Sequence, residues 1–137
     1  MKRLLLTITI SLAFLYINGQ SENKLIRKGN KHFDSGNFTE AKANYRMALE
    51  ENPISDKANF NLGNTNYNQE EFSEAERNFS RVADMTRSPL IESQAHFNRG
   101  NALMSQERFA ESIEAYKQTL RLNPNDEDAR YNLEYAR

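Results

Sequence analysis

The chain has 137 residues, of which 38% are apolar and 27% are charged, and its formal net charge is −1. This length leaves room for one compact domain, and the composition is typical of charge-rich helical proteins. The absence of cysteine excludes disulfides, thiolate metal sites, a cysteine nucleophile and a lipid-modified N-terminal cysteine.

Residues 1–19 belong to a different class of sequence from the rest. Two positive residues are followed by an almost wholly apolar run over 4–17, and Gly19 is a small residue before a polar stretch. This arrangement predicts a secretory signal peptide that is cleaved before Gln20. The alternative is a retained membrane anchor, but an apolar run of 14 residues spans about 21 Å as a helix, short of the roughly 30 Å of a bilayer core. We therefore expect an exported, periplasmic protein, either peripheral to the inner membrane or anchored in it.

A threefold repeat organises the predicted domain over residues 20–137. The repeats are expected over 22–55, 56–92 and 93–126, with a partial or capping helix over 127–137. Their glycines are 34 and then 37 residues apart, and small residues and aromatic residues follow at fixed offsets. The repeated positions are Gly29, Gly63 and Gly100, then Phe38, Phe72 and Phe109, then Ala41, Ala75 and Ser112, then Tyr45, Phe79 and Tyr116.

The physical chemistry of these positions predicts a helix pair in each repeat. Glycine inside a helix costs up to about 1 kcal/mol, so its recurrence indicates a close helix contact. Aromatic residues seven apart fall on one helical stripe, and each pair of helices buries its faces by stacking on the next pair. We expect an all-α solenoid with helices over 21–35, 38–51, 55–69, 72–85, 89–105, 108–121 and 126–137. Ser88 is expected to cap the fifth of these helices, and Pro89 to be its first residue.

The repeated residues resemble the tetratricopeptide repeat. Leu62-Gly63, Ala75 and Phe79 match its pattern in the second repeat, and Gly29, Ala41, Tyr45, Ala48 and Pro53 match it in the first. The chain departs from the pattern in having no tryptophan, in Lys28 and Arg99 before two of the glycines, and in Arg87 where proline is expected. The resemblance implies a protein-binding scaffold whose first helices line a concave groove.

A second resemblance concerns the run from Asn123 to Glu134. This run is similar to BatC-type proteins of Bacteroidota, which accompany von Willebrand A-domain membrane proteins and a MoxR-type ATPase in a cluster linked to aerotolerance. The resemblance implies envelope or membrane-anchored protein partners. The Gln/Lys-rich tail common in that family is not in this sequence, and Leu133 and Tyr135 are expected to be exposed at the end of the repeat array.

Asparagines recur at positions where the family resemblance places ligand contacts. A carboxamide offers donors and an acceptor, so two rows of them could hold the backbone of an extended peptide. The alternative is that these asparagines bond one another or the neighbouring backbone and only fix the stacking of the repeats. The candidate groove residues are Arg27, Asn30, Asn61, Asn64, Asn98, Asn101 and Asn132.

The predicted groove is polar, uncharged and aromatic. Some relatives bind a C-terminal carboxylate with two asparagines and three basic residues. The resemblance assigns the asparagines to Asn30 and Asn61, but places Ile26, Gln94 and Asn98 at the basic positions, so a chaperone partner of that kind is not expected. The candidate aromatic residues of the groove are Phe33, Phe60, Tyr67 and Phe97.

The sequence offers little support for catalysis. His32 and His96 are 64 residues apart without a matching ladder of acids, and no phosphate loop, nucleophile elbow or metal-ligand spacing is present. No basic stripe with interleaved aromatics favours nucleic acid. We therefore expect a non-catalytic adaptor without cofactor, metal or small-molecule substrate, the alternative being a structural module of a larger envelope assembly protein.

Two charged clusters remain. The basic residues of the first mature helix are interpreted as a solvated face first and a partner contact second; they are Lys24, Arg27, Lys28 and Lys31. The acids that begin the fourth helix are interpreted as a solvated helix start that the helix dipole favours; they are Glu70, Glu71, Glu74 and Glu76.

Overall fold

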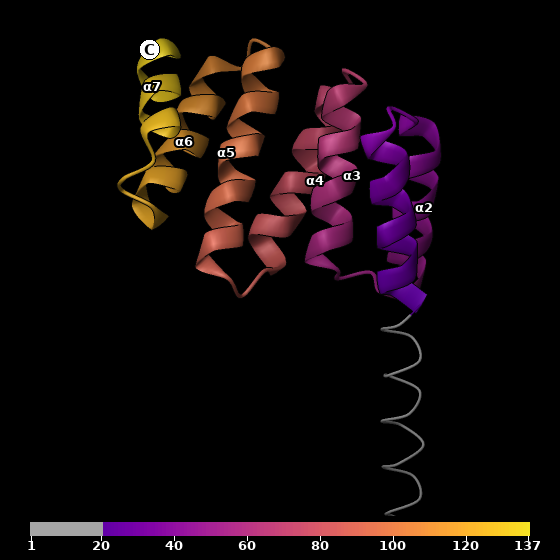
Figure 1. The fold of residues 1–137 in the computed structure, drawn as a ribbon. Helices are drawn as coiled ribbons and strands as arrows, with labels where there is room; N and C mark the ends of the chain where they lie inside the picture. Colours follow the sequence, from indigo (N-terminus) through magenta and orange to yellow (C-terminus); the bar gives the residue numbers. More distant parts are fainter. Residues whose placement is uncertain (1–20) are drawn as a thin grey trace, which may run out of the picture. The chain divides into compact units, whose positions relative to one another are not determined.

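The computed structural model describes residues 21–137, which are helical throughout apart from short turns (Figure 1). The predicted signal peptide over residues 1–19 lies outside them. Residues 21–34 are helical, and the six following helices are α2 (Phe38–Glu51), α3 (Asp56–Asn68), α4 (Phe72–Met85), α5 (Pro89–Ser105), α6 (Phe109–Leu122) and α7 (Glu127–Tyr135). The described part of the chain contains no strand, which confirms the all-α prediction. Each observed boundary lies within two residues of the predicted one.

The chain forms two compact units. The first ends at Ala58, and the second runs from Asn59 to Arg137. In the second unit α4 packs against α5, α5 against α6, and α6 against α7 (Figure 1). None of the described helices is both long enough and apolar enough to cross a bilayer.

The turns inside the three helix pairs share a left-handed residue. Gly36, Glu70 and Glu107 have φ angles of 75°, 61° and 58°. In each turn the next residue donates its N–H to a carbonyl five positions earlier, for example Asn37 to His32 at 2.8 Å. This bond closes the end of the first helix as in the Schellman motif. Glycine adopts the conformation freely, whereas glutamate is strained in it.

The predicted start of α5 is confirmed. The Ser88 hydroxyl accepts a hydrogen bond from the backbone N–H of Ile91 at 3.3 Å, and Pro89 is the first helical residue. The Asp126 carboxylate caps α7 in the same way, accepting from the N–H of Ala129 at 2.9 Å. Both caps satisfy N–H groups that have no partner within their own helix.

Each repeat glycine lies against the aromatic ring of its paired helix. A Cβ placed on Gly29, Gly63 or Gly100 would lie 2.5, 2.7 or 2.5 Å from a ring carbon of Tyr45, Phe79 or Tyr116, respectively. Each of these rings is 1% exposed. The predicted close contact is therefore confirmed, and its partner is the large aromatic side chain of the same repeat. The small residues Ala41, Ala75 and Ser112 are fully buried.

The expectation for the end of the chain is correct for one residue and wrong for the other. Tyr135 is 75% exposed, as predicted, but Leu133 is only 7% exposed. Leu133 is buried because α7 packs on α6, so α7 buries its own apolar positions, Ala129 and Leu133, without a second helix.

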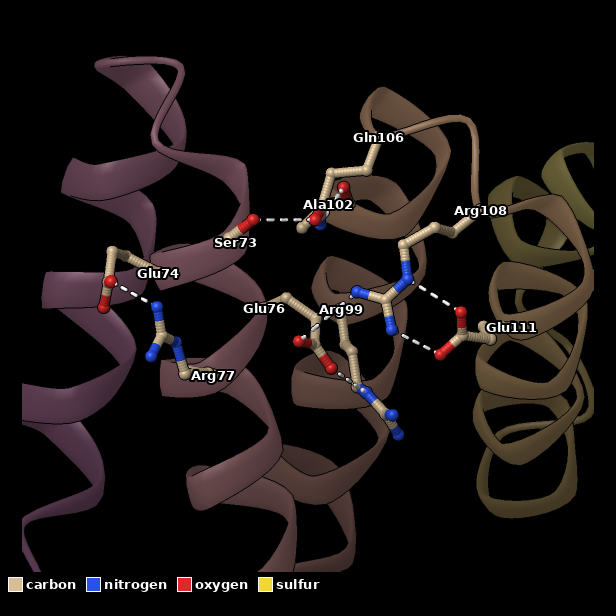
Figure 2. Close-up of polar contacts among 9 residues, drawn as sticks. All are labelled: Ser73, Glu74, Glu76, Arg77, Arg99, Ala102, Gln106, Arg108 and Glu111. Carbon is tan, nitrogen blue, oxygen red and sulfur yellow. Dashed lines mark hydrogen bonds and ion pairs between the residues drawn. The ribbon is translucent and has the colours of Figure 1, made fainter.

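Glu76 was also predicted wrongly as part of a solvated helix start. Its side chain is 15% exposed, and its carboxylate accepts a hydrogen bond from Arg99 Nε at 3.0 Å (Figure 2). An Arg108 nitrogen lies 3.8 Å from the other carboxylate oxygen, and Arg108 also bonds Glu111. This network joins α4, α5 and the start of α6. It also explains Arg99, which stands where the family pattern asks for an apolar residue.

Candidate functional site

The second unit brings four of the predicted asparagines together as two amide pairs. Asn64 lies on α3, Asn98 and Asn101 on α5, and Asn132 on α7, all half-buried. Asn98 Nδ2 donates to Asn64 Oδ1 at 3.4 Å, and Asn132 Nδ2 donates to Asn101 Oδ1 at 3.1 Å. Each pair links the first helices of two successive repeats.

The other three candidates are not members of these two amide pairs. Asn61 is half-buried on α3, and its backbone carbonyl accepts a hydrogen bond from the Thr65 hydroxyl at 2.7 Å. Arg27 and Asn30 are exposed on the helix over residues 21–34, in the first unit. Asn30 Oδ1 accepts a hydrogen bond from the Tyr45 hydroxyl at 2.8 Å.

In two of the repeats a tyrosine bonds the asparagine that lies fifteen residues before it in the sequence. The sequence analysis did not predict this bond. Tyr45 donates to Asn30, and Tyr116 donates to Asn101 Oδ1, also at 2.8 Å. The second repeat has Phe79 at this position, so no hydroxyl reaches Asn64. The signal was present in the sequence, because the buried aromatic and the asparagine after each glycine keep a constant spacing.

The amide groups that remain available are donors. Asn101 Oδ1 already accepts two hydrogen bonds, from Tyr116 and Asn132. Within residues 21–137, neither Asn64 Nδ2 nor Asn101 Nδ2 donates to another residue. Both groups therefore offer N–H donors that suit the carbonyl oxygens of a peptide backbone.

Two hollows adjoin these asparagines. The smaller has a volume of about 60 Å³ and is lined by Asn64, Tyr67, Asn68, Phe79, Asn98 and Asn101. The larger has a volume of about 310 Å³ and is lined by Tyr67, Asn101, Met104, Ser105, Tyr116, Tyr131, Asn132 and Tyr135. We call the two together the tyrosine–amide groove. The described residues that line it include none with a charged side chain.

The aromatic residues of the groove differ in part from those predicted. Tyr67 lines both hollows, and its hydroxyl lies 3.2 Å from Ser105 Oγ. Phe60 and Phe97 instead pack against the buried rings of the core, with centroids 5.5 Å from Phe79 and 6.0 Å from Tyr116, respectively. Phe33 packs against Phe38 in the first unit, with centroids 5.3 Å apart.

Tyr131 and Tyr135 were missed as groove residues. They are 71% and 75% exposed and lie one turn apart on α7. Their spacing of four residues could have revealed a shared helix face.

Two buried groups have shifted pKa values. Burial raises the pKa of Tyr116 to about 12, so its hydroxyl keeps its proton and acts as a donor to Asn101 at neutral pH. Burial also lowers the pKa of His96, more strongly than the nearby Glu92 carboxylate raises it. The imidazole of His96 on α5 is therefore uncharged at neutral pH. Among the described residues no cluster of three or more His, Cys, Asp or Glu side chains could hold a metal ion.

Comparison with known proteins assigns these features to a family. Sequence models described as tetratricopeptide repeat match residues 26–89 and 93–126. A comparison with curated proteins finds no match.

Solved structures resemble the fold over most of the chain. The first tetratricopeptide domain of Spaghetti (RPAP3), bound to the HSP90 peptide SRMEEVD, is 26% identical with a TM-score of 0.79, covering 85% of this chain and 90% of that one. The first such domain of human RPAP3 is 25% identical with a TM-score of 0.76, over 85% and 89% of the two chains. The N-terminal domain of stress-induced protein-1 from C. elegans is 15% identical with a TM-score of 0.81, over 87% and 96%.

Proposed function

The chain belongs to the tetratricopeptide repeat family, and we propose that it is a non-catalytic adaptor of the cell envelope that holds a partner protein in the tyrosine–amide groove. Domains of this family act as protein–protein interaction modules. One observation carries the choice of site. The free amide donors of Asn64 and Asn101 lie in the same uncharged groove as the exposed rings of Tyr131 and Tyr135.

The chemistry of this groove suits an extended polypeptide. Amide N–H groups bind backbone carbonyls whatever the sequence of the segment, and tyrosine rings cover apolar side chains while losing little conformational entropy. Each neutral hydrogen bond contributes about 0.5–1.5 kcal/mol. Binding should therefore be of modest affinity and loose sequence preference. Because the groove is uncharged, its binding should depend weakly on salt.

Asn64 is the best position at which to test the groove. Within residues 21–137 its side chain receives only the long 3.4 Å bond from Asn98, since Phe79 has no hydroxyl to donate. Replacing Asn64 by alanine should therefore change binding with little effect on stability. Replacing Asn101 would also leave the buried hydroxyl of Tyr116 without its acceptor, which costs about 1–3 kcal/mol of folding free energy.

The experiment is capture of partners from an envelope extract by the purified protein, followed by titration of the captured protein. The double variant Asn64→Ala and Tyr135→Ala should bind about tenfold more weakly, which corresponds to roughly 1.4 kcal/mol, or about one hydrogen bond and one ring contact. Its urea midpoint should stay close to that of the parent chain. Tyr116→Phe is the matched control, because it should lower stability without removing an exposed group of the groove.

A second candidate function is supported by the amide pairs themselves. Asn98–Asn64 and Asn132–Asn101 each join two repeats, as expected of a structural module in a larger envelope assembly protein. If the double variant binds its partner as well as the parent chain does, the asparagines serve stacking and this second function is favoured.

The envelope location rests on residues 1–19, whose pattern is typical of a signal peptide. Mass spectrometry of protein isolated from the native envelope should find a mature N-terminus near Gln20. Retention of the first 19 residues would indicate an anchored form, and recovery from the cytosol would contradict export.

The BatC-type resemblance of the run from Asn123 to Glu134 supports a proposal for the class of partner. We propose envelope or membrane-anchored partners within a von Willebrand A-domain and MoxR-associated stress system linked to aerotolerance. The HSP90 peptide bound by the Spaghetti domain is not proposed as a ligand of the groove. Ile26 is 5% exposed and Asn98 bonds Asn64, so neither position offers a cation for a terminal carboxylate.

A further inference from the structure

Tyrosine is concentrated in the larger hollow of the tyrosine–amide groove. Four of the six tyrosines of the chain line this hollow of about 310 Å³; they are Tyr67 on α3, Tyr116 on α6, and Tyr131 and Tyr135 on α7. Because 27% of the chain is charged, about two of the eight lining residues would carry a charge at the average composition, yet none does. The lining of this hollow therefore differs from the rest of the chain in two respects, its tyrosine content and its lack of charge.

The polar atoms of the hollow include both hydrogen-bond donors and acceptors. Among the described residues, Asn101 Nδ2 has no acceptor and Asn132 Oδ1 has no donor. The hydroxyl groups of Tyr67 and Ser105 lie 3.2 Å apart, and either of them can donate. The hollow therefore suits an uncharged ligand whose own polar groups both donate and accept, which is the property of a hydroxyl group.

The exposed rings of Tyr131 and Tyr135 supply the apolar part of the lining. They are 71% and 75% exposed and lie one turn apart on α7. An aromatic ring packs its face on another flat apolar surface, and a tyrosine keeps a polar group at its tip. A sugar ring has such a surface, because in β-linked glucose the C–H bonds point to the two faces of the ring and the hydroxyls lie round its edge. A sugar ring therefore matches both the polar and the aromatic part of the lining.

The size of the hollow favours a compact group over a long extended segment. Its volume of about 310 Å³ lies at the lower end of the range of about 300–1,000 Å³ found for ligand sites. The adjoining hollow measures only about 60 Å³, far below that range. One sugar ring can lie within the larger hollow, whereas most of an extended peptide would have to lie outside it.

We propose that the larger hollow binds one uncharged sugar ring of a saccharide. Tyr131 packs on a face of the ring, Asn101 Nδ2 donates to one of its hydroxyls, and Asn132 Oδ1 accepts from another. The proposal rests on the proposed function for the choice of the groove and deepens it, because it names the chemical group that enters the larger hollow. Affinity is weak, about millimolar, because a single ring buries little surface.

The exposed position of Tyr131 allows it to be changed without disturbing the core. Tyr131→Ala removes the stacking ring, and Tyr131→Phe keeps it. Leu90 is 65% exposed on α5 and does not line the hollow, so Leu90→Ala is the matched control for loss of an exposed apolar side chain. Asn64 lines only the smaller hollow, so Asn64→Ala separates the sugar site from the contact with a partner protein.

The test is saturation-transfer difference NMR of cellobiose, on the protein as the producing cell processes it, with the aromatic protons of the protein irradiated. The parent chain should transfer saturation to the ring C–H protons of cellobiose and not to sorbitol, which has hydroxyl groups but no ring. In titrations, Tyr131→Ala should weaken binding about three- to tenfold, as expected for loss of one ring contact. Tyr131→Phe, Leu90→Ala and Asn64→Ala keep that contact, so each should change binding by less than about twofold.

Three outcomes would overturn the proposal. Absence of saturation transfer to cellobiose would do so directly, and equal losses in Leu90→Ala and Tyr131→Ala would indicate general adhesion to apolar surface. Transfer to blocked tetra-alanine but not to cellobiose, with dependence on Tyr131, would assign the hollow to a peptide.

Periodate treatment of a captured partner distinguishes two sources of the sugar, because periodate cleaves neighbouring hydroxyl-bearing carbons. Weaker binding of the treated partner places the sugar on that partner, and unchanged binding makes a free saccharide the ligand. The effect of Asn64→Ala on the partner is measured separately from cellobiose binding, so this proposal and the proposed function fail separately.

Discussion

The contact between each repeat glycine and its aromatic partner should make one added methyl group destabilising. A Cβ on Gly63 would lie 2.7 Å from Phe79 Cε1, and a Cβ on Gly100 would lie 2.5 Å from Tyr116 Cε1. Both distances are shorter than side-chain carbons tolerate. The two rings are 1% exposed, so neither can move aside into solvent.

The expected magnitude is the difference between two effects. Glycine to alanine inside an open helix stabilises by about 1 kcal/mol, whereas overpacking a core costs about 1–3 kcal/mol. Gly63→Ala should therefore destabilise by up to about 2 kcal/mol, and Gly63→Leu, which must displace Phe79 further, by about 1–3 kcal/mol. Gly100→Ala should cost about 0.5–1.5 kcal/mol more than Gly63→Ala, because moving Tyr116 also breaks its bond to Asn101.

Urea unfolding followed by far-ultraviolet circular dichroism would measure these differences. The control is a double-mutant cycle in which Gly63→Ala is made in a Phe79→Leu background, where the smaller side chain gives room for the methyl group. There the alanine should become neutral or stabilising. If Gly63→Ala raises the stability of the parent chain by about 1 kcal/mol, as in an open helix, the close contact does not exist.

Three further predictions concern stability. Glu70→Gly and Glu107→Gly should each stabilise by roughly 0.5–1 kcal/mol in urea unfolding, because both glutamates have positive φ; a lower midpoint would contradict the strain. Burial lowers the pKa of His96 below 6.5, so the unfolded chain takes up the proton first, and the free energy of unfolding should fall as the pH drops below about 6.5. His96→Gln should flatten that pH dependence, and an unchanged profile would assign it to other groups. Phe79→Tyr should stabilise by about 0.5–1.5 kcal/mol, since the new hydroxyl would reach Asn64 as its counterparts do in the other repeats; a destabilised chain would show that no room exists for it.

Most of the fold could be predicted from the sequence because the repeat supplies the same information three times. The glycines, the aromatic residues and the Ser88-Pro89 start of α5 are local signals, and the helices follow them to within two residues. Burial at the end of the chain was less predictable. The burial of Leu133 depends on how α7 packs on α6, and the local periodicity of the sequence does not determine that packing.

The sequence predicted which asparagines belong to the candidate site, but it did not predict the hydrogen bonds that they form. The recurrence of asparagine after each glycine indicated a row, but its hydrogen bonds depend on what faces each amide in space. Tyr116 reaches Asn101 across a helix pair, and Asn132 reaches it from the next repeat. Glu76 illustrates the same limit, because its partner Arg99 lies 23 residues away, on another helix.

The asparagine that follows each repeat glycine has different hydrogen bonds in different repeats. The difference depends on whether the buried aromatic residue of the repeat carries a hydroxyl group. Where the buried aromatic is tyrosine, the asparagine oxygen accepts a hydrogen bond from its hydroxyl, which ties the amide to a buried side chain, as at Asn101. Where the aromatic is phenylalanine, the asparagine loses that bond and keeps only a long contact with the next repeat, as at Asn64. A core-bonded amide cannot turn to meet a ligand without leaving a buried hydroxyl unsatisfied, so its orientation is set by folding. Asn64 does not accept a bond from a buried hydroxyl, so its side chain can reorient towards a partner with little effect on stability. We therefore expect the middle repeat to adjust most easily to a bound partner.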